Sequence, residues 1–173
     1  MRLIKKMIHN DLKTLEGNMF ERKAARGIIL DNRKILLLYT KRYNDYSIPG
    51  GGIDEGEDII NALKRELSEE VGAKDIEILK EYGYTEEYRP HYKKEYDLMH
   101  MLSYIFVCKL NSPLEKTNFE DYEIANGMEV KWVDIDEAIK HNLDVISNKE
   151  KSMGFSVERE TFVLQLIRDE LLK

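Results

Sequence analysis

The stretch "IPGGGIDEGEDIINALKRELSEEVGA", residues 48–73, carries the strongest pattern in this chain of 173 residues. After an initial Ile-Pro it has three consecutive glycines, residues 50–52, and later a segment in which apolar side chains recur every three or four positions. That period places them on one face of an α-helix, so residues 58–71 are predicted to be helical. Gly72 follows directly and is predicted to end the helix, because glycine is common just after a helix C-terminus.

Three glutamates of the predicted helix, Glu66, Glu69 and Glu70, stand at positions i, i+3 and i+4 and would project from one face within a single turn. Like charges at this spacing destabilise an isolated helix by roughly 0.2–0.5 kcal/mol per pair. A bound divalent cation would turn that repulsion into a favourable interaction. Because the donors are carboxylate oxygens and the sequence has no Cys/His cluster, Mg²⁺ or Mn²⁺ is expected rather than zinc.

The residues around the predicted helix suggest what such a cation would act on. Mg²⁺ in proteins keeps several waters and often binds substrate phosphate oxygens, so a phosphate-containing substrate is expected. Pro49 and the glycines after it form a loop almost free of side chains, whose backbone groups can approach a ligand or a metal. Glu57 and Asp58 are expected in the first turn of the helix, where negative charge complements the helix dipole.

The remaining apolar patterns predict a mixed α/β chain. Strands are predicted at residues 24–30, 35–39, 75–89, 100–110 and 129–135. The segment 100–110 is apolar on both alternating faces, so helices are expected to cover both sides of the sheet. Further helices are predicted from Asp134 or Asp136 through Lys140, and from an N-cap at Ser156 onward.

The length and composition favour one globular domain in the cytoplasm. A chain of 173 residues that is 42% hydrophobic can bury one core and is too short for two ordinary domains. Residues 1–22 are expected to be an N-terminal extension that could add one strand to a domain of residues 23–173. The single cysteine, Cys108, fits a reducing compartment, and the first residues are too polar for a signal peptide. No segment approaches the roughly 18 apolar residues of a membrane span.

The charge balance argues against some partners. With 27 basic and 33 acidic residues the formal net charge is −6, which disfavours binding to a nucleic-acid duplex. A small phosphorylated ligand is compatible with this charge, because a metal ion can reverse the local sign of an acidic pocket. The expected partner is therefore a small molecule that carries phosphate.

The pattern G-x5-E-x7-R-E-U-x-E-E-x-G-U, where U is a bulky apolar residue, runs through residues 51–73. Residue frequencies in this chain give a chance match on the order of 10⁻⁶. The pattern is the Nudix box, and the chain resembles the Nudix hydrolase family of MutT-like proteins; only Ala73, a packing position, is smaller than usual. The resemblance implies a Nudix-type α/β/α sandwich with a mixed sheet between helices. It also implies hydrolysis of a nucleoside diphosphate linked to another moiety.

The resemblance implies roles for residues of the box and for one residue outside it. The implied metal ligands are Glu66, Glu69, Glu70, the backbone carbonyl of Gly51 and, through water, Glu57, which could instead be structural. Arg65 is implied to orient a box carboxylate through a bidentate pair rather than to contact substrate. The implied reaction is attack of water on a phosphorus atom of the diphosphate bridge, aided by Mg²⁺ or Mn²⁺. The general base would be Glu69 or Glu70 in the box, or Glu129 outside it.

Substrate contacts outside the box are predicted from segments that often line the cleft in this family and from a group of tyrosines. The candidates are Arg26, Arg42, Tyr46 and, for stacking on a base, Tyr88. The substrate is left open between a nucleoside triphosphate, an oxidised nucleotide and a nucleotide sugar such as ADP-ribose. Subfamily markers do not separate these, because Tyr88 and Pro90, at plus 15 and plus 17 from Ala73, are both displaced from the expected spacings.

Two other functions fit the same residues. A binding module would sense a nucleotide without hydrolysing it. An isoprenoid diphosphate isomerase would use the same metal scaffold with a cysteine and a glutamate as proton donor and acceptor, but Cys108 lies inside a predicted strand and is poorly placed for this role. Family members are often dimers, so a homodimer is one expected assembly, and no membrane partner is expected.

Overall fold

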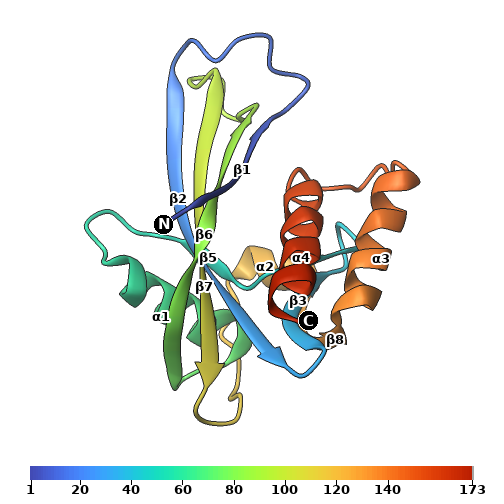
Figure 1. Ribbon diagram of the computed structural model, residues 1–173. Helices are drawn as coiled ribbons and strands as arrows, with labels where there is room; N and C mark the ends of the chain where they lie inside the picture. Colours follow the sequence, from blue (N-terminus) through green and yellow to red (C-terminus); the bar gives the residue numbers. More distant parts are fainter. Residues whose placement is uncertain (173) are drawn as a thin grey trace.

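The computed structural model describes residues 1–172, in which strands and helices are mixed along the chain (Figure 1). The strands are β1 (Leu3–Ile8), β2 (Met19–Asp31), β3 (Lys34–Thr40), β4 (Asp45–Ser47), β5 (Gly50–Gly52), β6 (Ile76–Arg89), β7 (Leu98–Leu110) and β8 (Met128–Asp134). The helices are α1 (Ile59–Val71), α2 (Asp121–Ala125), α3 (Ile135–Ser147) and α4 (Val157–Leu171).

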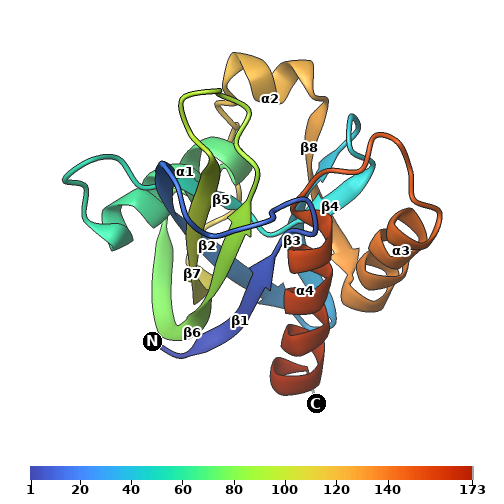
Figure 2. The same cartoon turned by 90° about the horizontal axis from the view of Figure 1, so that it is seen from above.

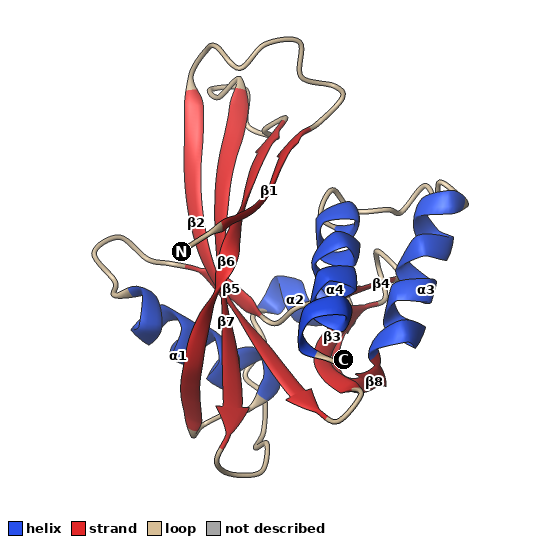
Figure 3. Cartoon of the chain, in the orientation of Figure 1, coloured by secondary structure: helices blue, strands red, loops and turns tan. Residues whose placement is uncertain are grey.

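One mixed sheet joins all of these strands (Figure 3). Its main order is β1-β6-β7-β2-β3-β4, while β5 pairs with β2 and β8 pairs with β3. The pairs β1–β6 and β2–β7 are parallel, and the others are antiparallel. The predicted mixed α/β class is confirmed.

Helices cover both faces of the sheet, as the apolar pattern predicted. Along β3, Ile35 and Leu37 pack with α3 and α4, whereas Leu36 and Leu38 pack with α1. This alternation follows from the strand geometry, in which successive side chains point to opposite faces. Seen from above, α1 lies on one side of the strands and α3 with α4 on the other (Figure 2). The architecture is therefore an α/β/α sandwich.

Helix α1 begins and ends close to the predicted residues. The carboxylate of Asp58 accepts the backbone N–H groups of Ile60 at 3.0 Å and of Asn61 at 3.1 Å, which makes it the N-cap. Gly72 ends the helix in a left-handed conformation, with φ 71°. The expectation that Glu57 and Asp58 would occupy the first turn was wrong, because the capping bonds place both residues before the first helical position.

The later helices differ in detail from the sequence prediction. Asp134 is the N-cap of α3, and the helix continues past Lys140 to Ser147 because Val145 is buried against the core. Ser156 precedes α4 as predicted, but its hydroxyl makes no capping hydrogen bond. The short helix α2 was not predicted from the sequence. No helix among residues 1–172 is long and apolar enough to cross a membrane.

Four strand segments extend beyond α1, while their other side contacts α4, where Arg159 pairs with Glu87 and Phe162 lies against Lys5 (Figure 1). We call this projection the arm; it consists of residues 3–8, 19–23, 84–89 and 98–103. Strand β1 pairs in parallel with the end of β6 and so forms one edge of the arm. The turns that close the arm lie at residues 9–18 and 90–97.

Candidate active site

A pocket of about 380 Å³ is lined by the box glutamates of α1, Glu66, Glu69 and Glu70. The glycines of β5 form another part of its wall, as the sequence predicted for a loop without side chains. The structure therefore brings the predicted helix face and the predicted glycine loop together at one cavity. The other lining residues come mainly from strands β2, β3, β4 and β8 and from helices α2 and α4.

Glu70 is the most buried of the three box glutamates, at 5% exposure. Its carboxylate accepts the backbone N–H of Gly50 at 2.6 Å, which joins α1 to the glycine loop. Burial raises the pKa of Glu70 well above its usual range. Gly50 itself has φ 132°, and a Cβ there would overlap the carbonyl oxygen of Ala25, so only glycine fits this position.

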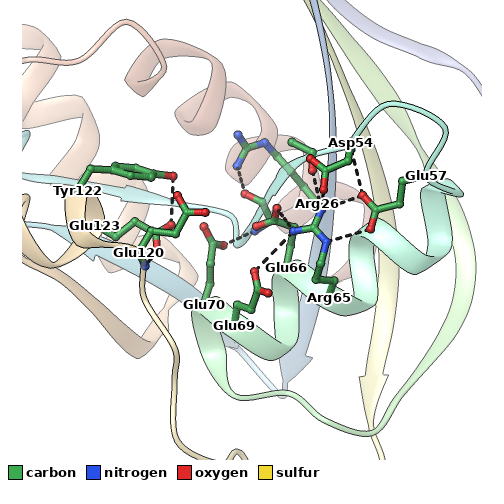
Figure 4. Close-up of polar contacts among 12 residues, drawn as sticks. Arg26, Asp54, Glu57, Arg65, Glu66, Glu69, Glu70, Glu120, Tyr122 and Glu123 are labelled. Carbon is green, nitrogen blue, oxygen red and sulfur yellow. Dashed lines mark hydrogen bonds and ion pairs between the residues drawn. The ribbon is translucent and has the colours of Figure 1, made fainter.

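Arg65 binds several carboxylates beside the pocket (Figure 4). It forms a bidentate pair with Glu57, Nε to Oε1 at 2.9 Å and Nη2 to Oε2 at 2.8 Å, and a third bond to Glu66 at 2.7 Å. It also donates to the carbonyl of Gly52 at 3.0 Å. This pairing lowers the pKa of Glu57 to about 2. This geometry is the bidentate pairing expected of Arg65. Both carboxylate oxygens of Glu57 are bound to the Arg65 guanidinium.

The donor groups in the pocket fit a hard divalent cation. The Glu66 carboxylate lies against Gly51, in space that a Cβ at that position would fill. Burial raises the pKa of Glu66 even though Arg65 opposes the shift, so its negative charge is incompletely compensated. Carboxylate and carbonyl oxygens are the ligands that Mg²⁺ and Mn²⁺ prefer. Within residues 1–172, no group of three His, Cys, Asp or Glu side chains has the spacing that binds a metal ion. The Glu66 carboxylate is hydrogen-bonded to Arg65.

A second group of carboxylates faces the box from helix α2 (Figure 4). Glu123 is 4% exposed, and its carboxylate accepts the backbone N–H of Glu120 at 2.7 Å in a capping box. Its negative charge contributes to the raised pKa of Glu70. Tyr122 also lines the pocket, and its hydroxyl donates to the carboxylate of Glu123 at 3.4 Å. Burial raises the pKa of this hydroxyl.

Backbone hydrogen bonds explain how α2 reaches the box. After β7 the chain returns to α1, where the N–H of Asn118 donates to the carbonyl of Glu69 at 2.7 Å. The N–H of Glu115 donates to the carbonyl of Gly72 at 2.8 Å. Sequence reasoning missed Glu120 and Glu123, because nothing in their spacing relates them to a motif about 50 positions earlier.

Arg26, a predicted substrate contact, lines the same pocket from β2. Its Nη1 donates to the carbonyls of Ile48 at 2.9 Å and Gly50 at 3.3 Å. Its Nε is buried and has no hydrogen-bond partner within the described residues. Burial, together with the charge of nearby Arg159, lowers the pKa of Arg26. The side chain thus supports the glycine loop and keeps one N–H group for another acceptor.

Buried charged side chains that no sequence pattern singled out lie beside the pocket. Glu160 of α4, 1% exposed, binds the guanidinium of Arg159 at 2.5 Å, and Arg159 also pairs with Glu87 of β6. Asp45 of β4 is 4% exposed, and burial with the nearby charge of Glu160 raises its pKa to about 6. These residues link three elements directly beneath the glycine loop.

The structure places Glu129 away from the box glutamates. Its carboxylate pairs with Lys41 at 2.6 Å and Lys131 at 2.9 Å, and these contacts lower its pKa to about 2. Its neighbour Met128 lines the pocket, but Glu129 is not among the lining residues. Alternation along β8 accounts for this, since adjacent side chains point to opposite faces.

Three further substrate candidates also lie outside the pocket lining. Arg42 donates to the side chain of Asn126 at 3.0 Å on the surface. Tyr46 packs against Tyr39, with ring centroids 5.2 Å apart. Tyr88 stacks on His100 in the arm, with centroids 4.6 Å apart. The structure therefore brings only Arg26 of the four candidates together with the box.

The sequence profile of the NUDIX domain matches residues 21–153. The chain belongs to the Nudix family. Curated relatives of this Nudix chain include RNA pyrophosphohydrolases from Bartonella henselae, 49% identical over 45 residues, and Campylobacter jejuni, 54% identical over 39 residues. These matches cover 26% and 22% of the chain and 26% and 25% of the relatives, so the chain spans about a quarter of their length.

Another relative, the RNA pyrophosphohydrolase of Actinobacillus succinogenes, is 49% identical over 57 residues, which are 31% of this Nudix chain and 29% of that protein. Among solved structures, the MutT NUDIX hydrolase from Burkholderia pseudomallei aligns with a TM-score of 0.47 and 20% sequence identity. That alignment covers 67% of the chain and 84% of the bacterial structure.

Proposed function

We propose that this Nudix protein is a metal-dependent pyrophosphohydrolase, which cleaves the diphosphate bridge of a nucleoside diphosphate derivative by attack of water on phosphorus. One observation carries the proposal. Glutamates from α1 and α2 line a single pocket of about 380 Å³ together with the glycine loop and Arg26, whose buried Nε has no hydrogen-bond partner within the described residues. Acidic oxygens beside an available arginine suit a cation together with a phosphate group.

The box residues would hold the cation. Glu66, Glu69, Glu70 and the carbonyl of Gly51 provide the oxygen donors for Mg²⁺ or Mn²⁺. When bound, the ion neutralises phosphate charge and lowers the pKa of a coordinated water. Because Glu57 is engaged by Arg65 in a bidentate pair, its role in this proposal is to fix the position of Arg65.

The other pocket residues would bind substrate and accept a proton. Arg26 donates its free Nε–H to a phosphate oxygen, which satisfies a buried donor and positions the diphosphate. Glu123, which faces Glu70 from α2, accepts the proton of the attacking water. Glu129 stays a prediction from the sequence, but Glu123 is better placed because Glu129 is paired with two lysines outside the pocket.

The alternatives receive less support from the described residues. An isomerase would need a reactive cysteine, yet Cys108 is 3% exposed in the core and burial raises its pKa to about 12. A sensor without activity would not need a full set of carboxylates around the box. The proposed substrate class is a nucleotide-like diphosphate. The name of the relatives, RNA pyrophosphohydrolase, adds RNA that carries a diphosphate bridge to the substrates to be tested.

The test is a substrate panel with the purified protein. Nucleoside triphosphates, oxidised nucleotides, nucleotide sugars and a short 5′-triphosphorylated RNA are incubated with Mg²⁺ or Mn²⁺. The products are separated by chromatography, because a nucleotide sugar gives a nucleoside monophosphate and a sugar phosphate, whereas the other substrates release phosphate or pyrophosphate. Glu70→Gln should lower kcat at least about 100-fold. Glu77→Gln, at an exposed glutamate of β6, is the matched control and should leave the rate unchanged. Activity that persists in a chelator would exclude the proposed mechanism.

A further inference from the structure

A second groove, of about 360 Å³, lies beside the active-site pocket. It is formed by the start of β2, the residues after β5 and the loop 90–97, which closes one end of the arm. Arg22, Gly52 and Asp54 line both the groove and the active-site pocket. The two cavities are therefore adjoining, and a substrate anchored by its phosphates in the pocket can extend into the groove.

Aromatic side chains form the groove's most unusual feature. Tyr92 is 83% exposed, although its ring is a large apolar surface. One face of it stacks on His91, with centroids 4.7 Å apart and planes 20° apart. His91 is in turn packed against Phe20 at 4.9 Å and Tyr96 at 5.0 Å. A cluster beneath it thus holds Tyr92 in place, while most of its surface remains open to a ligand.

Hydrogen bonds also fix the loop that carries these rings. The Nδ1 atom of His91 accepts the backbone N–H of Lys93 at 3.0 Å. At the other end of the loop, the N–H of Asp97 donates to the carbonyl of Asn18 at 2.8 Å. The aromatic surface is therefore a supported part of the arm, which limits the entropy that a ligand would have to overcome in ordering it.

The charge of the groove is opposite to that of the chain. Its lining contains three cationic side chains, Arg22, Lys23 and Lys93, and two acidic ones, Glu21 and Asp54. The whole protein by contrast has a formal net charge of −6. Cations beside an exposed aromatic ring form the combination by which proteins bind single-stranded nucleic acid, since phosphates contact the cations and bases stack on the rings.

We propose that this groove binds the nucleotide that follows the diphosphate in a short single-stranded RNA, with its base stacked on Tyr92 and its phosphate beside Arg22 and Lys23. The inference rests on the proposed function, because it assumes that the diphosphate lies in the active-site pocket. Gly52 has no side chain between the two cavities, and the Arg22 guanidinium approaches within 3.7 Å of where a Cβ of Gly52 would be. Arg22 is thereby placed at the junction, where the connecting phosphate of the RNA would pass.

The test measures binding without turnover. A five-nucleotide RNA with a non-hydrolysable 5′-triphosphate analogue and a 3′-fluorescent label is titrated with the protein in Mg²⁺, and its anisotropy gives Kd; the matching nucleoside triphosphate analogue serves as competitor. Tyr92→Ala should raise Kd for the RNA about tenfold, because stacking of one base contributes roughly 1–3 kcal/mol. It should leave the affinity for the nucleoside triphosphate unchanged. Tyr92→Phe keeps the ring and should bind RNA as the wild type does.

Two further measurements make the outcome specific. Phe155→Ala removes an exposed aromatic side chain outside the groove and should have no effect on RNA binding. Lys23→Ala should reduce the slope of log K against log salt by roughly 0.7, as expected for the loss of one phosphate contact on a single strand. An unchanged Kd in Tyr92→Ala, or wild-type protein that binds RNA no more tightly than the mononucleotide, would overturn the inference.

These results separate the inference from the proposed function. Hydrolysis of mononucleotides with no Tyr92-dependent RNA binding would leave the proposed function intact and remove the groove proposal. Tyr92-dependent RNA binding without hydrolysis of any panel substrate would support the groove proposal and rule out the proposed hydrolase function.

Discussion

The carboxylate of Glu160 in helix α4 accepts the backbone N–H of Ile48 at 2.9 Å, across 112 positions of sequence. The same short segment is held by Arg26, which donates to the carbonyls of Ile48 and Gly50, and by Glu70, which accepts the N–H of Gly50. Three charged side chains from three elements thus fix the backbone just before the glycine loop. The C-terminal helix supports the active site although none of its residues belongs to the Nudix box.

Replacing Glu160 tests this support. Glu160→Gln keeps an acceptor for the Ile48 N–H but removes the charge that pairs with buried Arg159, and we expect a loss of about 3 kcal/mol in the free energy of unfolding. Urea denaturation measures the effect. Glu158→Gln, at an exposed position two residues earlier in the same helix, is the control and should change the free energy of unfolding by less than about 0.5 kcal/mol. Equal effects of the two substitutions would show that the buried pair is not needed.

A pair of glycines tests the fit of the loop. Gly50→Ala should destabilise the protein by more than about 3 kcal/mol or prevent folding, because φ is 132° and the new Cβ would overlap the backbone of β2. Gly56→Ala should lower the free energy of unfolding by only about 1 kcal/mol. Its φ of 75° is unfavourable for alanine, but no atom lies within 4 Å of the added Cβ. Chemical denaturation of both variants gives the comparison. A tolerated alanine at residue 50 would contradict the observed packing.

Asp45 should make stability depend on pH. Its pKa in the folded protein is raised from 3.8 to about 6, mainly by burial, so the folded state holds the proton more tightly than the unfolded state. The contribution of the raised pKa to the free energy of unfolding is fully present below about pH 4 and is lost as pH rises through 6. Between pH 4 and 7, the free energy of unfolding of Asp45→Asn should therefore rise on the order of 2 kcal/mol relative to that of the wild type, which loses this contribution. Urea unfolding at several pH values would show a constant difference if the prediction is wrong.

The proposed cation should stabilise the folded protein. Because the box donors are assembled only in the native state, Mg²⁺ or Mn²⁺ at about 100 times Kd should add roughly 2.7 kcal/mol and raise the thermal midpoint. Calorimetry in chelator and in excess ion measures the shift. Glu69→Gln should reduce it, whereas Glu77→Gln should keep it. A midpoint that rises equally in the Glu69 variant would place the ion elsewhere.

The two candidate bases outside the box can be separated by a matched pair of variants. Glu123→Gln keeps an acceptor for the Glu120 N–H and should lower kcat about 100-fold or more with little change in KM, as loss of a general base does. Glu129→Gln should keep most of the activity, because this carboxylate is paired with Lys41 and Lys131. A large loss in the Glu129 variant alone would restore the role predicted from the sequence.

Local geometry made part of this site predictable. Within a helix, residues i, i+3 and i+4 share a face whatever the rest of the chain does, so the spacing of Glu66, Glu69 and Glu70 was enough to group their carboxylates. Gly72 marked the helix end for a similarly local reason. The apolar segments predicted strands β2, β3, β6, β7 and β8 but not the short strands β4 and β5. The run of apolar residues near Cys108 predicted a sheet covered on both faces, as found.

Tertiary structure alone decided which distant residues join the box. Glu123 reaches Glu70 because the chain after β7 bonds back to the end of α1, and Glu160 reaches Ile48 because α4 packs beneath the glycine loop. Glu129 lies outside the pocket lining because its position in β8 turns it toward two lysines. Such contacts depend on the order and register of strands far apart in sequence. Residue spacing therefore fixes the helix face that carries the box glutamates, and the packing of the sheet selects the side chains that surround it.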